Sequence, residues 1–198
     1  MRIILASTSK YRKQLLEDLG LTFHVQGPQV NEDDFKSKSR PGRSLCLELA
    51  KLKASEVASR FRTDLIIGAD QVAHFDGQIL SKPKEHSRAI SQLELLQGRS
   101  HELSTAICLI HPDRGVFTEV INAELAMRTL SRQEIEAYVD LDKPYDCAGS
   151  YKFERAGIAL FEKYSCEDPT AIVGLPVMAL CRGFERFELP LPFLFREK

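Results

Sequence analysis

The sequence predicts an α/β fold with a mixed sheet, and three observations carry this prediction. Segments with apolar residues at helical spacing alternate with short apolar segments typical of strands. Two long strand-like segments, ELSTAICLIHP (102–112) and VFTEVINAELAMRTL (116–130), flank the turn residues PDRG and predict one antiparallel hairpin. We find no repeat, low-complexity segment or linker, so residues 1–198 are expected to form a single domain.

The N-terminal half predicts strands and helices in turn. IILA (3–6) is an apolar strand, and serine and threonine caps then begin a helix that ends near Gly20. FHVQ predicts a further strand before a polar loop, and residues 43–61 form the clearest helix. DLIIGADQVAHF (64–75) predicts a long strand, DGQILSKP a turn with a short extended piece, and residues 84–98 an amphipathic helix that ends at Gly98.

The C-terminal half continues this pattern after the hairpin. Ser131 and Glu134 predict a capping box for the helix RQEIEAYVDL. Glycine and proline mark residues 142–157 as a loop, and IALFEKYS (158–165) predicts a strand. Residues 168–184 predict a loop that leads into a last helix.

Composition excludes several classes of protein. The formal net charge is −1, from 27 basic and 28 acidic residues, so no overall basic field favours nucleic acid. No apolar stretch reaches the ~20 residues of a membrane span, and the apolar run near the N-terminus is too short for a signal peptide. The five cysteines are odd in number and lack a CxxC pair, which favours reduced thiols. We therefore expect a cytoplasmic protein that binds neither membranes nor nucleic acid.

The stretch LIIGADQV (65–72) places a carboxylate in a strand that is otherwise apolar. A buried charge is unfavourable unless another group pairs with it, so Asp70 is expected to have a partner. Glu32, in the acidic loop VNEDD, could join Asp70 in holding a divalent metal, because Mg²⁺ takes one or two carboxylates together with substrate phosphates. The alternative for Glu32 is a solvated acidic loop.

Basic residues suggest a site for an anion. Ser7 and Ser9 lie between the first strand and the first helix, where backbone N–H groups are available to a phosphate. The first helical turn carries Arg12 between two lysines, although the helix dipole favours acids there, and a bound anion would reverse that penalty. The alternative is a capped helix with solvated basic residues.

Two further lysines are notable. Lys53 falls in the apolar stripe of the helix 43–61, so it must either have a partner or extend its amine to water. Lys82 in LSKP lies either at a phosphate site or simply in a surface turn. None of these features is specific alone, but together they indicate a polyphosphate site with basic residues, a metal and a buried aspartate.

The chain resembles a known family over nearly its whole length. ILASTSKYRKQLL, VNE, LAKLKA, IIGADQV, LSKP and CAGSYKFE occur in the order seen in the Maf-like nucleotide pyrophosphatases. The resemblance implies a Maf/ITPase-like fold, with a long, twisted mixed sheet, flanking helices and two lobes around a central cleft. It also implies hydrolysis of nucleoside triphosphates to monophosphate and pyrophosphate with Mg²⁺ or Mn²⁺, and it allows a homodimer.

The resemblance also assigns roles. It makes Asp70 catalytic and a metal ligand with Glu32, and it places Ser7, Ser9, Arg12, Lys53 and Lys82 at the substrate. Gln71 and CAGSYKFE resemble the 7-methyl-GTP branch, whose base-selecting positions fall on Tyr11, Gln71 and Glu154. Tyr11 departs from the tryptophan frequent in that branch, and Asn31 stands where an aspartate often precedes the metal glutamate.

The resemblance predicts a pyrophosphatase that removes 7-methyl-GTP, and it leaves two alternatives open. One is the same chemistry on dTTP, UTP or a broader set of modified nucleotides. The other is a nucleotide-binding regulator of septum formation with little turnover.

Overall fold

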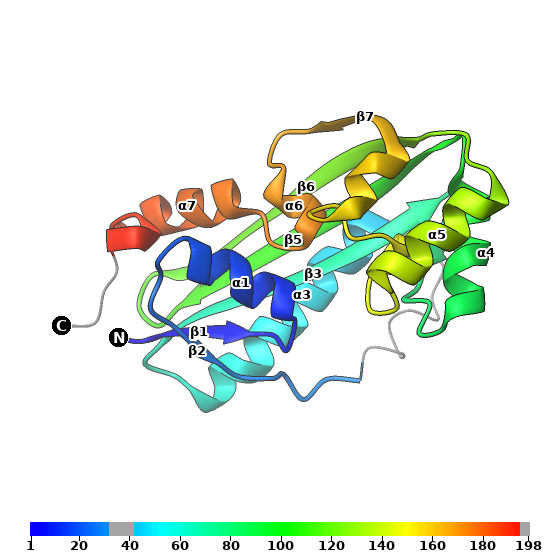
Figure 1. Ribbon diagram of the computed structural model, residues 1–198. Coiled ribbons are helices and arrows are strands. Elements are labelled where there is room, and N and C mark those ends of the chain that lie inside the picture. The colour runs from blue at the N-terminus through cyan, green and yellow to red at the C-terminus, as the bar shows by residue number, and fades with distance from the viewer. Residues whose placement is uncertain (32–41, 195–198) are drawn as a thin grey trace.

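The computed structural model describes residues 1–31 and 42–194, and in this part of the chain seven strands form one mixed sheet (Figure 1). Its strands are β1 (Ile3–Ala6), β2 (His24–Val25), β3 (Leu65–Phe75), β4 (Gln78–Leu80), β5 (Ser100–His111), β6 (Gly115–Met127) and β7 (Phe161–Cys166). The order is β2-β1-β3-β5-β6-β7, and β4 also pairs with β3. Strands β2, β1 and β3 are parallel, whereas β4, β5, β6 and β7 join antiparallel to their neighbours. The predicted mixed α/β fold is therefore confirmed, together with its hairpin.

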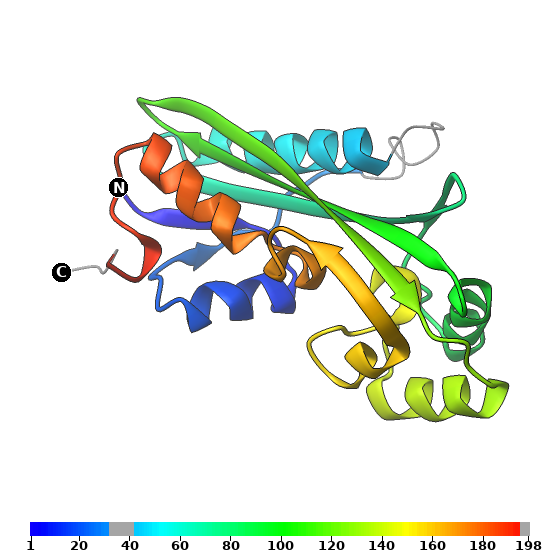
Figure 2. The same cartoon turned by 90° about the horizontal axis from the view of Figure 1, so that it is seen from above.

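Helices cover both faces of this twisted sheet (Figure 2). The α-helices are α1 (Lys10–Asp18), α3 (Gly42–Arg60), α4 (His86–Leu96), α5 (Arg132–Asp142), α6 (Thr170–Val173) and α7 (Val177–Arg186). The 3₁₀ helices are η1 (Ala148–Ser150), η2 (Ala156–Leu160) and η3 (Pro192–Leu194). None of the helices in the described ranges is long and apolar enough to cross a membrane.

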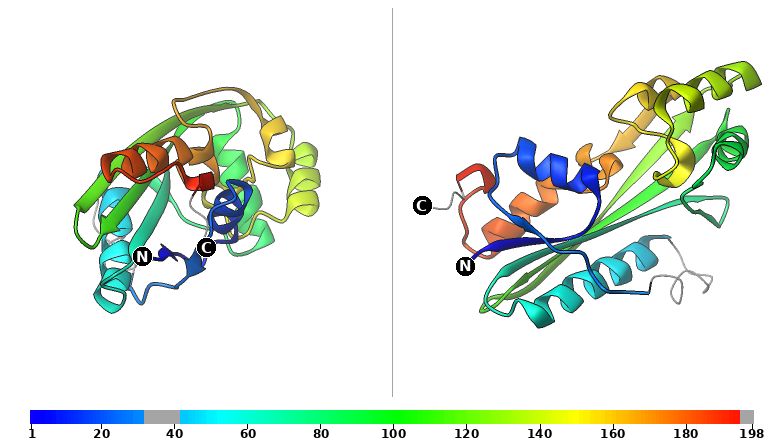
Figure 3. Two further views of the ribbon diagram at one scale, coloured as in Figure 1. Left: turned by 90° about the vertical axis from the view of Figure 1, so that its left-hand side faces the viewer. Right: turned by 60° about the horizontal axis from the view of Figure 1, so that its bottom comes forward.

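The core consists of three clusters of buried side chains that follow the two faces of the sheet. Helix α3 packs on one face, where Ile66 and Val72 of β3 contact its apolar side. On the other face, Leu65 and Ile67 pack with α1, α6 and α7. The third cluster surrounds α4 and α5 at the far end of the sheet, so the helices form two groups along its length (Figure 3).

An interruption in strand pairing creates the place for a site. Strand β1 pairs with β3 only as far as Ala6 opposite Gly68, and β4 begins its pairing at Ala73. Between these points, β3 residues 69–72 have no strand partner on that edge in the described part of the chain. Strand β1 ends at one end of this unpaired stretch and β4 ends at the other, so side chains from three segments meet there.

The structure differs from the sequence predictions at two segments near the C-terminus. The strand predicted for 158–165 begins only at Phe161, because the preceding residues form η2. For residues 168–184 the sequence predicts a loop leading into a last helix; that helix is α7, and the loop before it contains the short helix α6. The capping box of Ser131 and Glu134 is present as predicted.

Candidate active site

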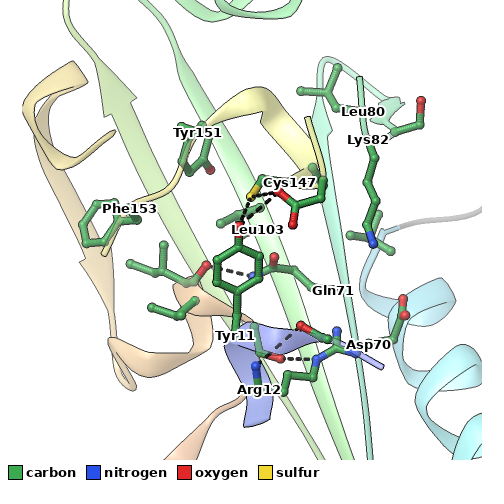
Figure 4. Close-up of a pocket in the computed structure, with 18 of the residues that line it drawn as sticks. Tyr11, Arg12, Asp70, Gln71, Leu80, Lys82, Leu103, Cys147, Tyr151 and Phe153 are labelled. Carbon is green, nitrogen blue, oxygen red and sulfur yellow. Dashed lines mark hydrogen bonds between the residues drawn. The ribbon is translucent and has the colours of Figure 1, made fainter. Parts of the chain in front are cut away.

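A pocket of 540 Å³ lies at the open edge of β3 (Figure 4). Residues from both groups of helices and from the loop around η1 line it. Most of the residues singled out in the sequence are among them: Ser9, Tyr11, Arg12, Lys53, Asp70, Gln71, Lys82 and Glu154. Ser7 lines an adjoining cavity of 350 Å³ that shares Ser9, Arg12, Lys53 and Lys82 with the first. Glu32 lies outside the described residues, and the functional roles of the others stay predictions.

Asp70 has Lys53 as its partner. Lys53 donates from Nζ to Oδ1 of Asp70 at 2.6 Å, and both side chains are less than 10% exposed. The pair forms because α3 lies directly on β3, where Gly68 leaves no Cβ between the helix and the strand. Lys53 therefore does not extend its amine to open water, and the alternative that it merely snorkels is wrong.

The loop from β1 into α1 forms the anion-binding side of the pocket. The Oγ of Ser9 accepts the first-turn N–H of Arg12, and no acidic residue lies in that turn. Arg12 donates from Nε to the carbonyl of Gly174 at 2.8 Å and from Nη1 to Oγ of Ser7 at 3.3 Å. These two contacts hold the guanidinium at the junction of the two cavities, where it can meet a phosphate oxygen.

More basic side chains reach the same pocket from the segment after β4. Lys82 is exposed and lines both cavities. Lys84 and Arg88 also line the larger cavity, and sequence reasoning missed both. Their signal was present, because KEHSR follows LSKP directly, but a lysine-rich turn usually lies in solvent. The pocket thus offers several cations to a ligand with more than one negative charge.

The predicted base-selecting residues Tyr11, Gln71 and Glu154 line the same pocket as this basic set. Nε2 of Gln71 donates to Oγ1 of Thr105 and to the carbonyls of Ala171 and Ile172, at 2.8–3.1 Å. Its Oε1 is therefore the atom left to meet a ligand. Glu154 lies at the rim, where partial removal from water raises the pKa of its carboxyl.

Two pocket residues that sequence reasoning missed contact Tyr11. Its hydroxyl donates to Oδ1 of Asp146 at 3.0 Å and lies 3.5 Å from Sγ of Cys147 (Figure 4). Burial raises the pKa of the Cys147 thiol to about 12, so this cysteine stays protonated and is a poor nucleophile. Cys147 is the first residue of CAGSYKFE and Asp146 directly precedes it, and only the fold brings this segment to α1.

The described residues fit a divalent cation that substrate phosphates help to hold. They contain no group of three or more His, Cys, Asp or Glu side chains able to form a metal site alone. Asp70 uses Oδ1 for Lys53, and in the described part of the chain its Oδ2 accepts no hydrogen bond. One such oxygen together with phosphate oxygens is an ordinary donor set for Mg²⁺.

Comparison with known proteins places this geometry in a family, since the model of the Maf-like protein family matches residues 2–187. The chain belongs to the Maf-like protein family. A Maf-like relative from Bdellovibrio bacteriovorus, named 7-methyl-GTP pyrophosphatase, is 42% identical over 95% of this chain and 98% of its own length. A protein of the same name from Xanthomonas axonopodis pv. citri is 44% identical over 96% of this chain and 99% of its own.

Among solved structures, the Ham1 protein of Staphylococcus aureus aligns with 79% of this Maf-like chain and 90% of its own. The TM-score is 0.48 and the sequence identity 16%, a level that carries no argument of its own.

Proposed function

We propose that this Maf-like protein is a nucleoside triphosphate pyrophosphatase that converts 7-methyl-GTP into 7-methyl-GMP and pyrophosphate, and so removes a modified nucleotide. The observation that carries the proposal is the buried Asp70, which lines one pocket together with basic, aromatic and acidic side chains: Arg12, Lys82, Tyr11 and Glu154. The name of the relatives supports the same substrate.

Three side chains of the pocket suit a 7-methylated guanine. This base carries a positive charge spread over its rings, so it gains from an aromatic face and from a carboxylate that accepts its N–H edge. Tyr11 supplies the aromatic ring and Glu154 the carboxylate, and both line the pocket. Gln71 offers Oε1, because its amide nitrogen is engaged by Thr105 and the α6 carbonyls, and that oxygen accepts rather than donates.

The basic side chains of the pocket suit the triphosphate. Arg12 and Lys82 line both cavities and would neutralise phosphate oxygens as charge redistributes in the transition state. Ser7 and Ser9 add hydroxyl groups just before the start of α1. Lys53 compensates the charge of Asp70 and also borders both cavities.

In the chemical step, Asp70 orients a water molecule and accepts its proton. The water oxygen forms a bond to the α-phosphorus while the bridging bond to the β-phosphate breaks, and pyrophosphate leaves with that electron pair. Asp70, with Glu32 as the predicted second ligand, would hold a divalent cation, which would lower the pKa of the attacking water and balance phosphate charge. Arg12 and Lys82 keep the triphosphate aligned for the attack.

A panel of nucleotides with and without Mg²⁺, with detection of pyrophosphate, tests the proposal. We expect 7-methyl-GTP to be hydrolysed much faster than GTP, dTTP or UTP, and only when the cation is added. Equal rates on 7-methyl-GTP and dTTP would refute the base preference but keep the pyrophosphatase. Tight binding without pyrophosphate release from any nucleotide would instead support a nucleotide-binding regulator.

We further propose a cytoplasmic homodimer. The cytoplasm supplies nucleoside triphosphates, and the described helices include none that spans a membrane. For a dimer, support comes from apolar side chains exposed near the end of the described chain, at Met178, Leu191, Phe193 and Leu194. Light scattering on the purified protein decides between monomer and dimer.

A further inference from the structure

Asp146 connects two side chains of α1 across the mouth of the pocket. Its Oδ1 accepts the hydroxyl of Tyr11 at 3.0 Å, and its Oδ2 lies 3.1 Å from Nζ of Lys10. Tyr11 and Asp146 both line the larger cavity, and all three residues border the smaller one. Because α1 belongs to the anion-binding side and Asp146 to the loop before η1, this contact joins the two sides of the site.

These contacts affect the face that Tyr11 presents. The hydrogen bond at the hydroxyl fixes the ring at its far end, while α1 fixes it at the Cα. A phenol that donates to a carboxylate also shifts electron density toward its ring, because the proton is partly drawn away. An electron-rich ring attracts a cationic base more strongly.

Asp146 also controls a competing cation. Nζ of Lys10 lies 5.0 Å from the centroid of the Tyr11 ring, within the range of a cation–π contact. A free ammonium group there would repel a positively charged base on the same ring. The carboxylate of Asp146 neutralises that ammonium, so the ring stays available to a second cation.

We propose that Asp146 is a positioning residue for base selection, which acts through Tyr11 by orienting its ring, enriching it in electrons and neutralising Lys10. The proposal rests on the proposed function, since it assumes a cationic base. It assigns a use to the hydroxyl that distinguishes Tyr11 from a plain aromatic ring. The competing explanation is that Asp146 only ties α1 to the η1 loop, which would affect every nucleotide alike.

The test compares Asp146→Ala, Asp146→Asn, Tyr11→Phe and the double variant Tyr11→Phe/Asp146→Ala on 7-methyl-GTP and on GTP. We expect Asp146→Ala to raise KM for 7-methyl-GTP about threefold to tenfold with little change in kcat, and to leave KM for GTP nearly constant. Asp146→Asn keeps an acceptor but loses the charge, so it should fall between wild type and Asp146→Ala. Tyr11→Phe should add little once Asp146 is absent, because both changes remove the same contact.

Asp140→Asn is the matched control, since Asp140 is an exposed carboxylate of α5 that contacts His86 outside the pocket. It should leave both substrates unaffected. Equal increases in KM for 7-methyl-GTP and GTP in Asp146→Ala would overturn the proposal, as would additive effects of Tyr11→Phe and Asp146→Ala. Either result would show that Asp146 only ties α1 to the η1 loop. A wild type without preference for 7-methyl-GTP would refute the base preference of the proposed function. A preference that survives Asp146→Ala would refute only the role of Asp146.

Discussion

At the scale of single residues, the contact between Lys53 and Asp70 changes the expected effect of replacing Lys53, a lysine in the apolar stripe of α3. From the sequence alone, replacing a lysine in an apolar stripe by an apolar residue would be expected to stabilise the protein. The structure shows its amine paired with a buried carboxylate, so removing it would leave Asp70 charged and uncompensated. Sequence reasoning identified both residues as unusual, but their pairing depends on how α3 lies on β3.

We therefore expect Lys53→Met to lower the free energy of unfolding by about 3–5 kcal/mol. Loss of one partner of a buried ion pair has this effect because the desolvated charge that remains has lost its partner. Urea denaturation measures the change, and Lys51→Met is a matched control because Lys51 is exposed on the same helix. Equal stability of the two variants would contradict a paired role for Lys53.

Asp70→Asn should abolish turnover while nucleotide binding persists. Asparagine keeps the shape and can still accept a hydrogen bond from Lys53, but it cannot take a proton from water and is a poorer metal ligand. The measurement is kcat for 7-methyl-GTP beside direct nucleotide binding by calorimetry. A variant with near wild-type kcat would remove Asp70 from the chemical step.

His101 makes stability depend on pH. It is 3% exposed, its Nε2 lies 2.8 Å from the Tyr151 hydroxyl, and burial lowers its pKa from 6.5 to about 4. Below pH 6.5 the unfolded chain binds a proton at this histidine that the folded protein does not bind until near pH 4. The contribution of neutral His101 to the free energy of unfolding is therefore fully present above pH 6.5 and is lost as pH falls toward 4.

The expected slope from His101 in that window is up to about 1.4 kcal/mol per pH unit. Urea denaturation between pH 5 and pH 7.5 measures it. His101→Gln should flatten the dependence, whereas a change at the exposed His24 should not. An unchanged slope in His101→Gln would show that other groups cause the loss of stability.

At the scale of secondary-structure elements, Gly68 sets how closely α3 approaches β3. A Cβ at this position would lie 2.7 Å from the carbonyl oxygen of Ala50 and 2.7 Å from Cβ of Ala54. Gly68→Ala should push the helix outward, lower the free energy of unfolding by about 1–3 kcal/mol and reduce kcat as Lys53 moves from Asp70. Thermal melting and kinetics check both effects, and an unchanged melting temperature would mean that the helix adjusts without strain.

Sequence periodicity predicted most elements because their apolar residues repeat at helical or strand spacing and end at turn residues. It was less accurate where tertiary contacts decide the backbone. Gly157 and Arg155 both donate their N–H groups to the carbonyl of Lys152, which folds the start of the predicted strand into η2. Helix α6 has only four residues, and too few apolar positions to produce a periodic pattern.

At the scale of the whole molecule, the pocket draws its walls from both groups of helices. A nucleotide that contacts both should stabilise them as one unit. With the inactive Asp70→Asn variant, 7-methyl-GTP at one hundred times its Kd should raise the free energy of unfolding by about 2.7 kcal/mol. The melting temperature at rising nucleotide concentration checks this, and GTP at the same concentration should have a smaller effect.

The same scale explains why the pocket itself was only partly predictable. The anion-binding loop, Asp70 and Lys82 lie in local patterns that point to phosphate chemistry without any knowledge of the fold. Asp146 and Tyr11 lie 135 residues apart, and nothing local connects them. Contacts of this kind depend on how the η1 loop returns over α1, which hydrophobic spacing does not encode.

The alternation of side chains along β3 has a consequence for how such an enzyme can diverge. Asp70 faces α3 and its lysine, whereas the next residue, Gln71, faces the opposite side and the α6 carbonyls. Under the proposed function, bond cleavage and base choice thus depend on neighbouring positions with separate surroundings. Mutation can therefore alter the accepted base without disturbing the hydrolytic pair, so descendants of one ancestor can acquire new substrates while they retain one reaction.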